Sequence, residues 1–81
     1  MIKIWGDFNQ RDELGRVVLP SADDMKSEQV NLESGLRVII WMEDIEAEGV
    51  LEKDKGVWRA RIVWETLKDR ETGRPLEFQP P

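Results

Sequence analysis

The sequence contains no cysteine, no histidine and no tyrosine. Without cysteine the chain can form neither a disulfide bond nor a thiolate metal site. Without histidine it lacks the most common general base and the most common transition-metal ligand. These absences count against a catalytic or cofactor-dependent role, so we expect no enzyme, no cofactor and no metal site.

Long hydrophobic runs are also missing. No window approaches the run of about 18 apolar residues that a membrane-spanning helix requires. The N-terminal stretch MIKIWGDF lacks the apolar core of a signal peptide. We therefore expect a cytoplasmic location and no membrane partner.

A clustered basic surface is the third absence. The chain has 17 acidic and 12 basic residues, with a formal net charge of −5. This balance argues against direct binding to the phosphates of nucleic acids. Most of the acidic residues precede residue 55 and basic residues predominate after it, so pairing between neighbouring strands is the expected arrangement of the charges.

The 81 residues are enough for one small domain, predicted to span residues 1–81. Its central part, residues 36–64, reads LRVIIWMEDIEAEGVLEKDKGVWRARIVW, with two polar breaks between three runs. Apolar residues in these runs tend to alternate with polar ones, which is typical of strands that bury one face. We predict a meander of three antiparallel strands.

Matching of faces suggests a register for the second hairpin of this meander. Placing Leu51 opposite Trp58 also places Gly49 opposite Ala60, with a turn at residues 53–56. A slip by one residue would set apolar side chains opposite arginines. We therefore predict this pairing.

The first hairpin follows the same logic. A tight turn at Glu43–Asp44 would pair Met42 with Ile45 and Val38 with Gly49. Neither turn residue adopts positive φ easily, so a wider turn is the alternative.

In this register Ile39 and Trp41, in the first strand of the meander, share a face with glutamates and arginines. Aromatic anchors within a charged rim are typical of protein-binding hot spots. The alternative is that the predicted strand at residues 2–5 or the C-terminal tail covers these two apolar side chains. The candidate protein-binding patch comprises Ile39, Trp41, Val50, Val63, Glu46, Glu48, Arg59 and Arg61.

Shorter elements flank the meander. The predicted flanking strands are residues 2–5, 16–19, 30–32 and 76–78, and the predicted helical turns are residues 22–28 and 65–69. The spacing of Asp7, Asn9 and Asp12 resembles a calcium loop, but Arg11 and Val18 occupy two ligand positions. We expect Asp and Asn to form Asx-turns there instead.

These elements predict an all-β fold, a small SH3-like barrel of five to six short antiparallel strands with one or two short helical turns. The sequence also resembles a group of short, functionally unassigned bacterial proteins. The segments that carry the resemblance are Gly6-Asp7-Phe8-Asn9, Gly15-Arg16-Val17-x-Leu19, Gly35-Leu36-Arg37-Val38, Glu48-Gly49-Val50-Leu51 and Trp58-x-Ala60. The resemblance implies a small β-barrel in a bacterial cytoplasm, and it brings no activity, cofactor or catalytic residue.

Two hypotheses for function follow. The favoured one is a non-catalytic protein-interaction or assembly module, whose partner is either another protein or a second copy of the chain. The alternative is a nucleic-acid-associated or nucleic-acid-mimicking regulatory protein, since small barrels often serve nucleic-acid machinery and an acidic surface can imitate phosphates.

Overall fold

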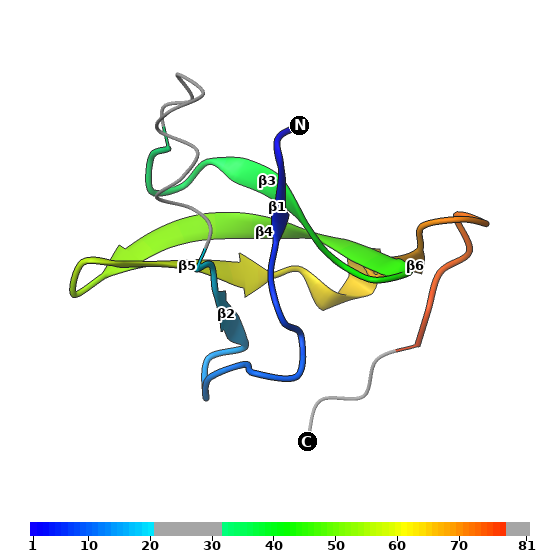
Figure 1. Ribbon diagram of the computed structural model, residues 1–81, viewed down its shortest axis with the longest axis horizontal. Helices are drawn as coiled ribbons and strands as arrows, with labels where there is room; N and C mark the ends of the chain where they lie inside the picture. Colours follow the sequence, from blue (N-terminus) through cyan, green and yellow to red (C-terminus); the bar gives the residue numbers. More distant parts are fainter. Residues whose placement is uncertain (21–31, 78–81) are drawn as a thin grey trace.

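The computed structural model describes residues 1–20 and 32–77, which form one strongly curved sheet (Figure 1). The strands are β1 (Lys3–Trp5), β2 (Arg16–Val18), β3 (Arg37–Met42), β4 (Ile45–Asp54), β5 (Val57–Ile62) and β6 (Lys68–Asp69), with a 3-10 turn, η2, at Trp64–Thr66. Their order in the sheet is β1-β3-β4-β5-β2, and β6 pairs with the start of β4 beyond the end of β5. The prediction of a small all-β domain is confirmed, and no α-helix occurs in the described residues.

The hairpin of β3 and β4 has the predicted register. Met42 is the partner of Ile45 and Val38 is the partner of Gly49, so the turn contains only Glu43 and Asp44. Glu43 adopts a φ of 51°, the positive value that a tight hairpin turn requires. The wider turn considered from the sequence is not formed.

The hairpin of β4 and β5 differs from its predicted register by two residues. Leu51 pairs with Ala60, and Trp58 pairs with Lys53. The reason is the turn, which has two residues rather than four: Lys55 and Gly56 have φ values of 52° and 81°. Because side chains alternate with a period of two, a shift by two leaves every residue on its predicted face.

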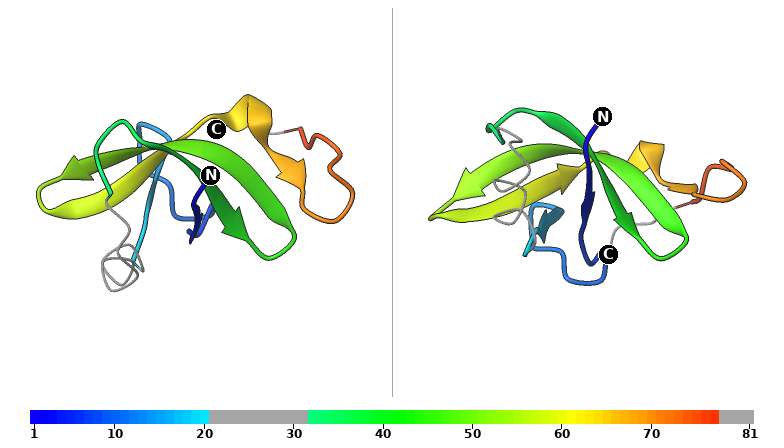
Figure 2. Two further views of the ribbon diagram at one scale, coloured as in Figure 1. Left: turned by 90° about the horizontal axis from the view of Figure 1, so that it is seen from above. Right: turned by 45° about the horizontal axis from the view of Figure 1, so that its top comes forward.

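The prediction of a closed antiparallel barrel is wrong. The edges of the sheet, β1 and β2, are not paired with each other, and β1 runs parallel to β3 rather than antiparallel. Figure 2 shows both short strands on the same side of the curved β3–β4–β5 meander. Strands of three residues offer few backbone groups for a closing ladder, so the sheet stays open.

Side chains, rather than a strand ladder, bring the two edges together. A Cβ atom added at Gly6 would lie 2.9 Å from Val17 Cγ1 and 3.2 Å from Leu19 Cδ2. Glycine therefore allows the chain after β1 to approach the side chains of β2 and its continuation. On the outer surface, this seam leaves a pocket of about 290 Å³ lined by Trp5, Asp7, Gln10, Val18 and Pro20.

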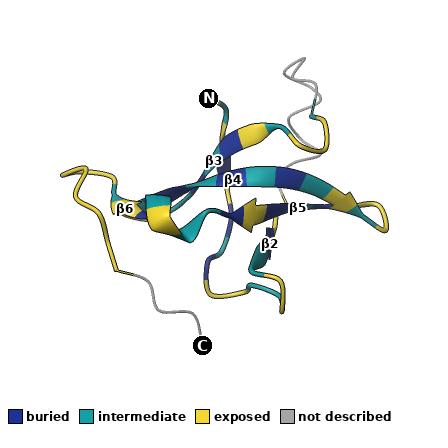
Figure 3. Cartoon of the chain, turned by 180° about the vertical axis from the view of Figure 1, so that it is seen from behind, coloured by how far each residue is buried: buried dark blue, intermediate teal, exposed yellow. Residues whose placement is uncertain are grey.

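The inner face of the curved sheet carries the core. Buried and less buried positions alternate along β5 and much of β4, while exposed residues gather in the turns and after β6 (Figure 3). Trp58 is in the core, as predicted, whereas Trp64 lies in η2 and packs half-buried against Phe8. The core comprises Ile4, Phe8, Val17, Leu19, Val38, Ile40, Ala47, Leu51, Trp58, Ala60, Ile62 and Leu67.

The flanking predictions have mixed outcomes. The helical turn predicted at residues 65–69 is confirmed in part, because the 3-10 turn η2 covers its first residues, but residues 68–69 form β6. The predicted closing strand at 76–78 is not formed by its described residues, although Pro75 makes an isolated bridge with Lys68. The helical turn predicted at 22–28 lies outside the described residues, as does most of the predicted strand 30–32, whose remaining residue Leu32 is not in a strand.

Candidate functional site

The predicted protein-binding patch lies on the outer face of the β3–β4–β5 meander. Ile39 is the cross-strand partner of Glu48, and Trp41 is the partner of Glu46. Val50 lies between Arg37 on β3 and Arg61 on β5. The structure therefore places these members of the patch on neighbouring strands.

Two predicted members lie apart from this group. Arg59 pairs with Glu52 in the sheet, and its Nη1 lies 3.5 Å from Asp12 Oδ2. Val63 follows the end of β5, where its N–H donates a hydrogen bond to the carbonyl of Glu48. The patch is thus divided into a region around Trp41 and a region of ion pairs around Arg59 and Arg61.

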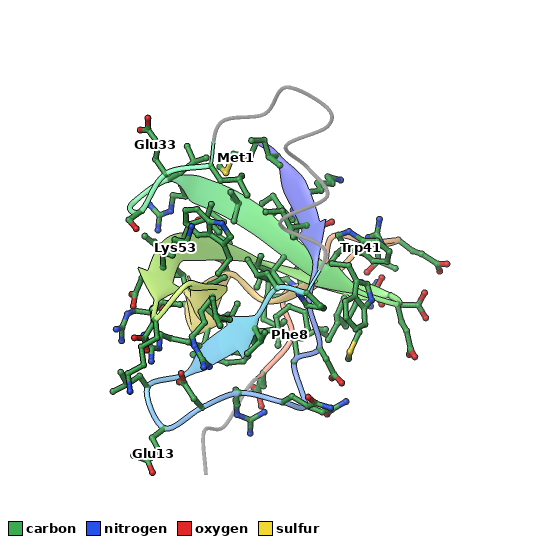
Figure 4. The ribbon with its side chains drawn as sticks, turned by 60° about the vertical axis from the view of Figure 1, so that its left-hand side comes forward. Met1, Phe8, Glu13, Glu33, Trp41 and Lys53 are labelled. Atoms are coloured by element: carbon green, nitrogen blue, oxygen red, sulfur yellow. The ribbon has the colours of Figure 1, made fainter. Side chains whose placement is uncertain are left out.

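The strand β1 does not cover the Trp41 region, whereas the segment after β6 covers part of it. β1 lies beside β3 at the sheet edge, and β6 extends the sheet on the other side of β4. The guanidinium of Arg70 stacks over the Trp41 ring at 4.6 Å from its centroid, and its Nη1 donates to the carbonyl of Glu43. Trp41 is therefore half-buried by the segment after β6 (Figure 4).

Trp5 belongs to this region and was missed by the sequence analysis. It is the parallel-strand partner of Trp41 and points to the same outer face. Trp5 is 37% exposed and also lines the seam pocket. The alternation of residues 2–5 was a readable signal for an outward Trp5, but nothing local indicated that β1 would pair with β3. We call Trp5 and Trp41 the tryptophan surface.

The second region of the patch is a network of ion pairs. Arg16, whose side chain is 14% exposed, lies at its centre, with nitrogens 2.8 Å from Asp12, 3.3 Å from Glu52 and 3.1 Å from Asp54. Arg61 Nε lies 2.6 Å from Glu52 Oε2. The predicted pairing of charges between neighbouring strands is found for Arg61 and Glu52, whereas Arg16, from the first half of the chain, makes three of the other contacts. The guanidinium groups of Arg16, Arg59 and Arg61 are therefore all paired with carboxylates.

The network lowers the pKa of two carboxyl groups, those of Asp12 and Glu52. Burial acts to raise the pKa of Asp12, but hydrogen bonds from the backbone and guanidinium of Arg16 and from the Leu14 N–H outweigh it, and the pKa is lowered. The hydrogen bond from Arg61, aided by Arg16, lowers the pKa of Glu52. A carboxyl group with a lowered pKa stabilises the fold while it is ionised, and this stabilisation is lost as the pH falls through its folded-state pKa.

We therefore expect acid to destabilise the protein through this network. The denaturant midpoint should change little between neutral pH and the ordinary carboxyl pKa of about 4, and should fall steadily below it. Chemical denaturation followed by tryptophan fluorescence at several pH values measures this. The double variant Asp12→Asn, Glu52→Gln should have a lower denaturant midpoint at neutral pH than the unmodified protein, and its midpoint should fall less steeply as the pH is lowered. An equal slope in both proteins would contradict the assignment.

The loop after β1 is organised by Asx-turns, as predicted. The N–H of Asn9 donates to Asp7 Oδ1, and the N–H groups of Leu14 and Arg16 donate to Asp12 Oδ1. In residues 1–20 and 32–77, no group of three or more acidic side chains is placed to hold a metal ion. No helix in that part of the chain is long and apolar enough to cross a membrane.

Comparisons of the chain with protein-family models, with curated proteins and with solved structures find no match. Its function is therefore argued from the residues of the outer face.

Proposed function

We propose that the chain is a non-catalytic protein-interaction or assembly module that contacts its partner through the tryptophan surface. The observation that carries this proposal is the pairing of Trp5 with Trp41 on the outer face of the sheet. Large aromatic side chains with one open face are the residues that dominate the binding energy of protein interfaces. Their polar surroundings, with Lys3 and Glu46 as neighbours, fit the rim of such an interface.

The nucleic-acid alternative has less support. Three arginines of the outer face, Arg16, Arg59 and Arg61, already contact carboxylates, so phosphate binding would have to displace these ion pairs. Titrating the protein with single-stranded and duplex nucleic acid at two salt concentrations separates the hypotheses. Binding that weakens steeply with salt would overturn the protein-interaction proposal.

Site-specific photo-crosslinking tests the proposal directly. A photoreactive phenylalanine derivative at position 5 should crosslink to a discrete protein, or to a second copy of the chain, in cells of the native host. The same derivative at Glu13, an exposed residue of the turn before β2 that does not belong to the tryptophan surface, is the control. Equal labelling from both positions, or labelling of nucleic acid alone, would contradict a protein interface at the tryptophan surface.

Trp5→Ala gives a second test. Because Trp5 lies on the outer face and is more than a third exposed, its loss should lower the free energy of unfolding by no more than about 1 kcal/mol. Loss of partner binding should nevertheless be nearly complete if Trp5 is a hot-spot anchor. Partner binding is compared between two variants, Trp5→Ala and Trp41→Phe, the second of which keeps Trp5. Both are measured at equal folded fraction, determined from denaturation curves. Undiminished binding of Trp5→Ala would contradict the proposal.

A further inference from the structure

Arg70 lies on one of the two residues of the tryptophan surface. Its guanidinium carbon is 4.6 Å from the centroid of the Trp41 ring, and its Nη1 donates a hydrogen bond of 3.1 Å to the carbonyl of Glu43. Trp41 is therefore half-buried although it points to the outer face, whereas Trp5 beside it is 37% exposed. A side chain of the chain itself thus occupies ring surface that an interface would use.

Few interactions hold this guanidinium in place. Among residues 1–20 and 32–77, no carboxylate lies within ion-pair distance of Arg70, in contrast to Arg16, Arg59 and Arg61. A guanidinium has five N–H donors, and one of those of Arg70 is bonded to the Glu43 carbonyl. At an exposed position the cation–π contact itself is weak. The Arg70 side chain can therefore leave the ring without breaking an ion pair.

The backbone beneath Arg70 is held independently of its side chain. The Arg70 N–H donates to the carbonyl of Asp44 at 2.7 Å, and Asp69 Oδ1 accepts two backbone hydrogen bonds from the turn that follows. Figure 1 shows this segment, in orange beyond β6, at the same end of the sheet as the turn between β3 and β4. Residues 70–77 are all exposed, so the segment buries no side chain. Movement of the guanidinium therefore requires only a change of side-chain rotamer, with the segment still bound to the sheet.

We propose that the Arg70 side chain is a displaceable cover of Trp41, an autoinhibitory contact that the partner removes to reach the ring. This inference rests on the proposed function. The ring surface beneath the guanidinium accommodates one neighbour at a time, so Arg70 and an anchoring side chain of the partner compete for it. The cover lowers the apparent affinity for the partner by the fraction of molecules in which the ring is open. In the absence of the partner it reduces the exposed aromatic surface.

Solvent access to the Trp41 ring tests the cover in the protein alone. In protein with ¹³C-labelled tryptophan, the ring C–H signals of the four tryptophans are assigned with single Trp→Phe variants. A neutral gadolinium chelate then broadens the signals that solvent reaches. Arg70→Ala should increase the broadening of the Trp41 signals and leave those of the buried Trp58 unchanged.

Arg74→Ala is the matched control. It removes the same charge from an exposed position of the same segment, four residues further along the chain. It should leave the broadening of the Trp41 signals as it is in the unmodified protein. Both variants should keep a denaturant midpoint close to that of the unmodified protein, because both side chains are exposed. Equal broadening of the Trp41 signals in all three proteins would overturn the inference.

Photo-crosslinking measures the consequence for binding. With the photoreactive derivative at position 5 and the partner below saturation, Arg70→Ala should raise the yield of crosslinked partner by about two- to fivefold, the factor that corresponds to an exposed cation–π contact. Arg74→Ala should leave the yield unchanged. An unchanged yield in Arg70→Ala would overturn the inference. A lower yield would also overturn it, because Arg70 would then belong to the binding surface itself.

Failure of the cover is distinguishable from failure of the proposed function. Site-dependent crosslinking from position 5 that does not respond to Arg70→Ala would refute the cover and leave the protein-interaction proposal standing. Absence of site-dependent crosslinking, in a protein whose Trp41 ring is uncovered by Arg70→Ala, would count against the proposed function, and the cover would then have no binding event to regulate.

Discussion

Trp58→Ala should lower the free energy of unfolding by about 3–5 kcal/mol, the usual cost of truncating a large aromatic residue in a core. Trp58 is 7% exposed and packs within the apolar cluster on the inner face of the sheet. The loss combines the transfer of apolar surface to water with a cavity that a small domain cannot readily close. Equilibrium denaturation monitored by far-ultraviolet circular dichroism measures the effect.

Two variants serve as controls for this prediction. Trp58→Phe should cost much less than Trp58→Ala, because the indole N–H is buried without a hydrogen-bond partner among the described residues and nothing polar is lost. Arg61→Ala, on the outer face, should cost under about 1 kcal/mol, since its ion pair with Glu52 is solvent-exposed. Similar losses for Trp58→Ala and Arg61→Ala would show that the two faces are assigned the wrong way round.

Gly49→Val should destabilise the protein by about 1–3 kcal/mol, although valine has the higher strand propensity. A Cβ atom at Gly49 would lie 3.1 Å from Ile40 Cγ1 and 3.2 Å from Ala60 Cβ, both in the core. The two branches of valine would add further contacts in a space that one methyl group already crowds. Overpacking of this kind forces backbone shifts in the central strand of the curved sheet.

The size dependence of the effect is its control. Gly49→Ala should be less damaging than Gly49→Val, because the smaller residue requires only a small displacement of Ile40. Denaturant midpoints of the three proteins, measured under identical conditions, should therefore fall in the order glycine, alanine, valine. A midpoint for Gly49→Val at or above that of the unmodified protein would contradict the crowding that the structure indicates.

Local patterns accounted for the meander but not for all of its geometry. The alternation in residues 45–52 and 57–62 placed Leu51, Ala60 and Trp58 correctly on the inner face. The pairing of Leu51 with Trp58 was nevertheless wrong, because face matching cannot distinguish registers that differ by two residues. The two-residue turn at Lys55–Gly56 decides between them.

The candidate site was predictable in part for the same reason. Ile39, Trp41, Glu46 and Glu48 were assigned to one face from the first hairpin alone, and the structure confirms their pairing. The contribution of Trp5 depends on a parallel pairing between strands more than 30 residues apart in the sequence, which alternation cannot reveal. The burial of Glu46 likewise depends on β6 reaching the edge of β4.

The sequence by itself determined the class of structure and the face of each strand in the meander, because side-chain alternation is a property of the local backbone. It also determined that the chain lacks thiol and imidazole chemistry. Only the tertiary structure decided which strands are neighbours, that the sheet stays open between β1 and β2, and that Trp5 lies beside Trp41. These outcomes depend on contacts between distant segments, where turn geometry and core packing select one arrangement among several that share the same local pattern.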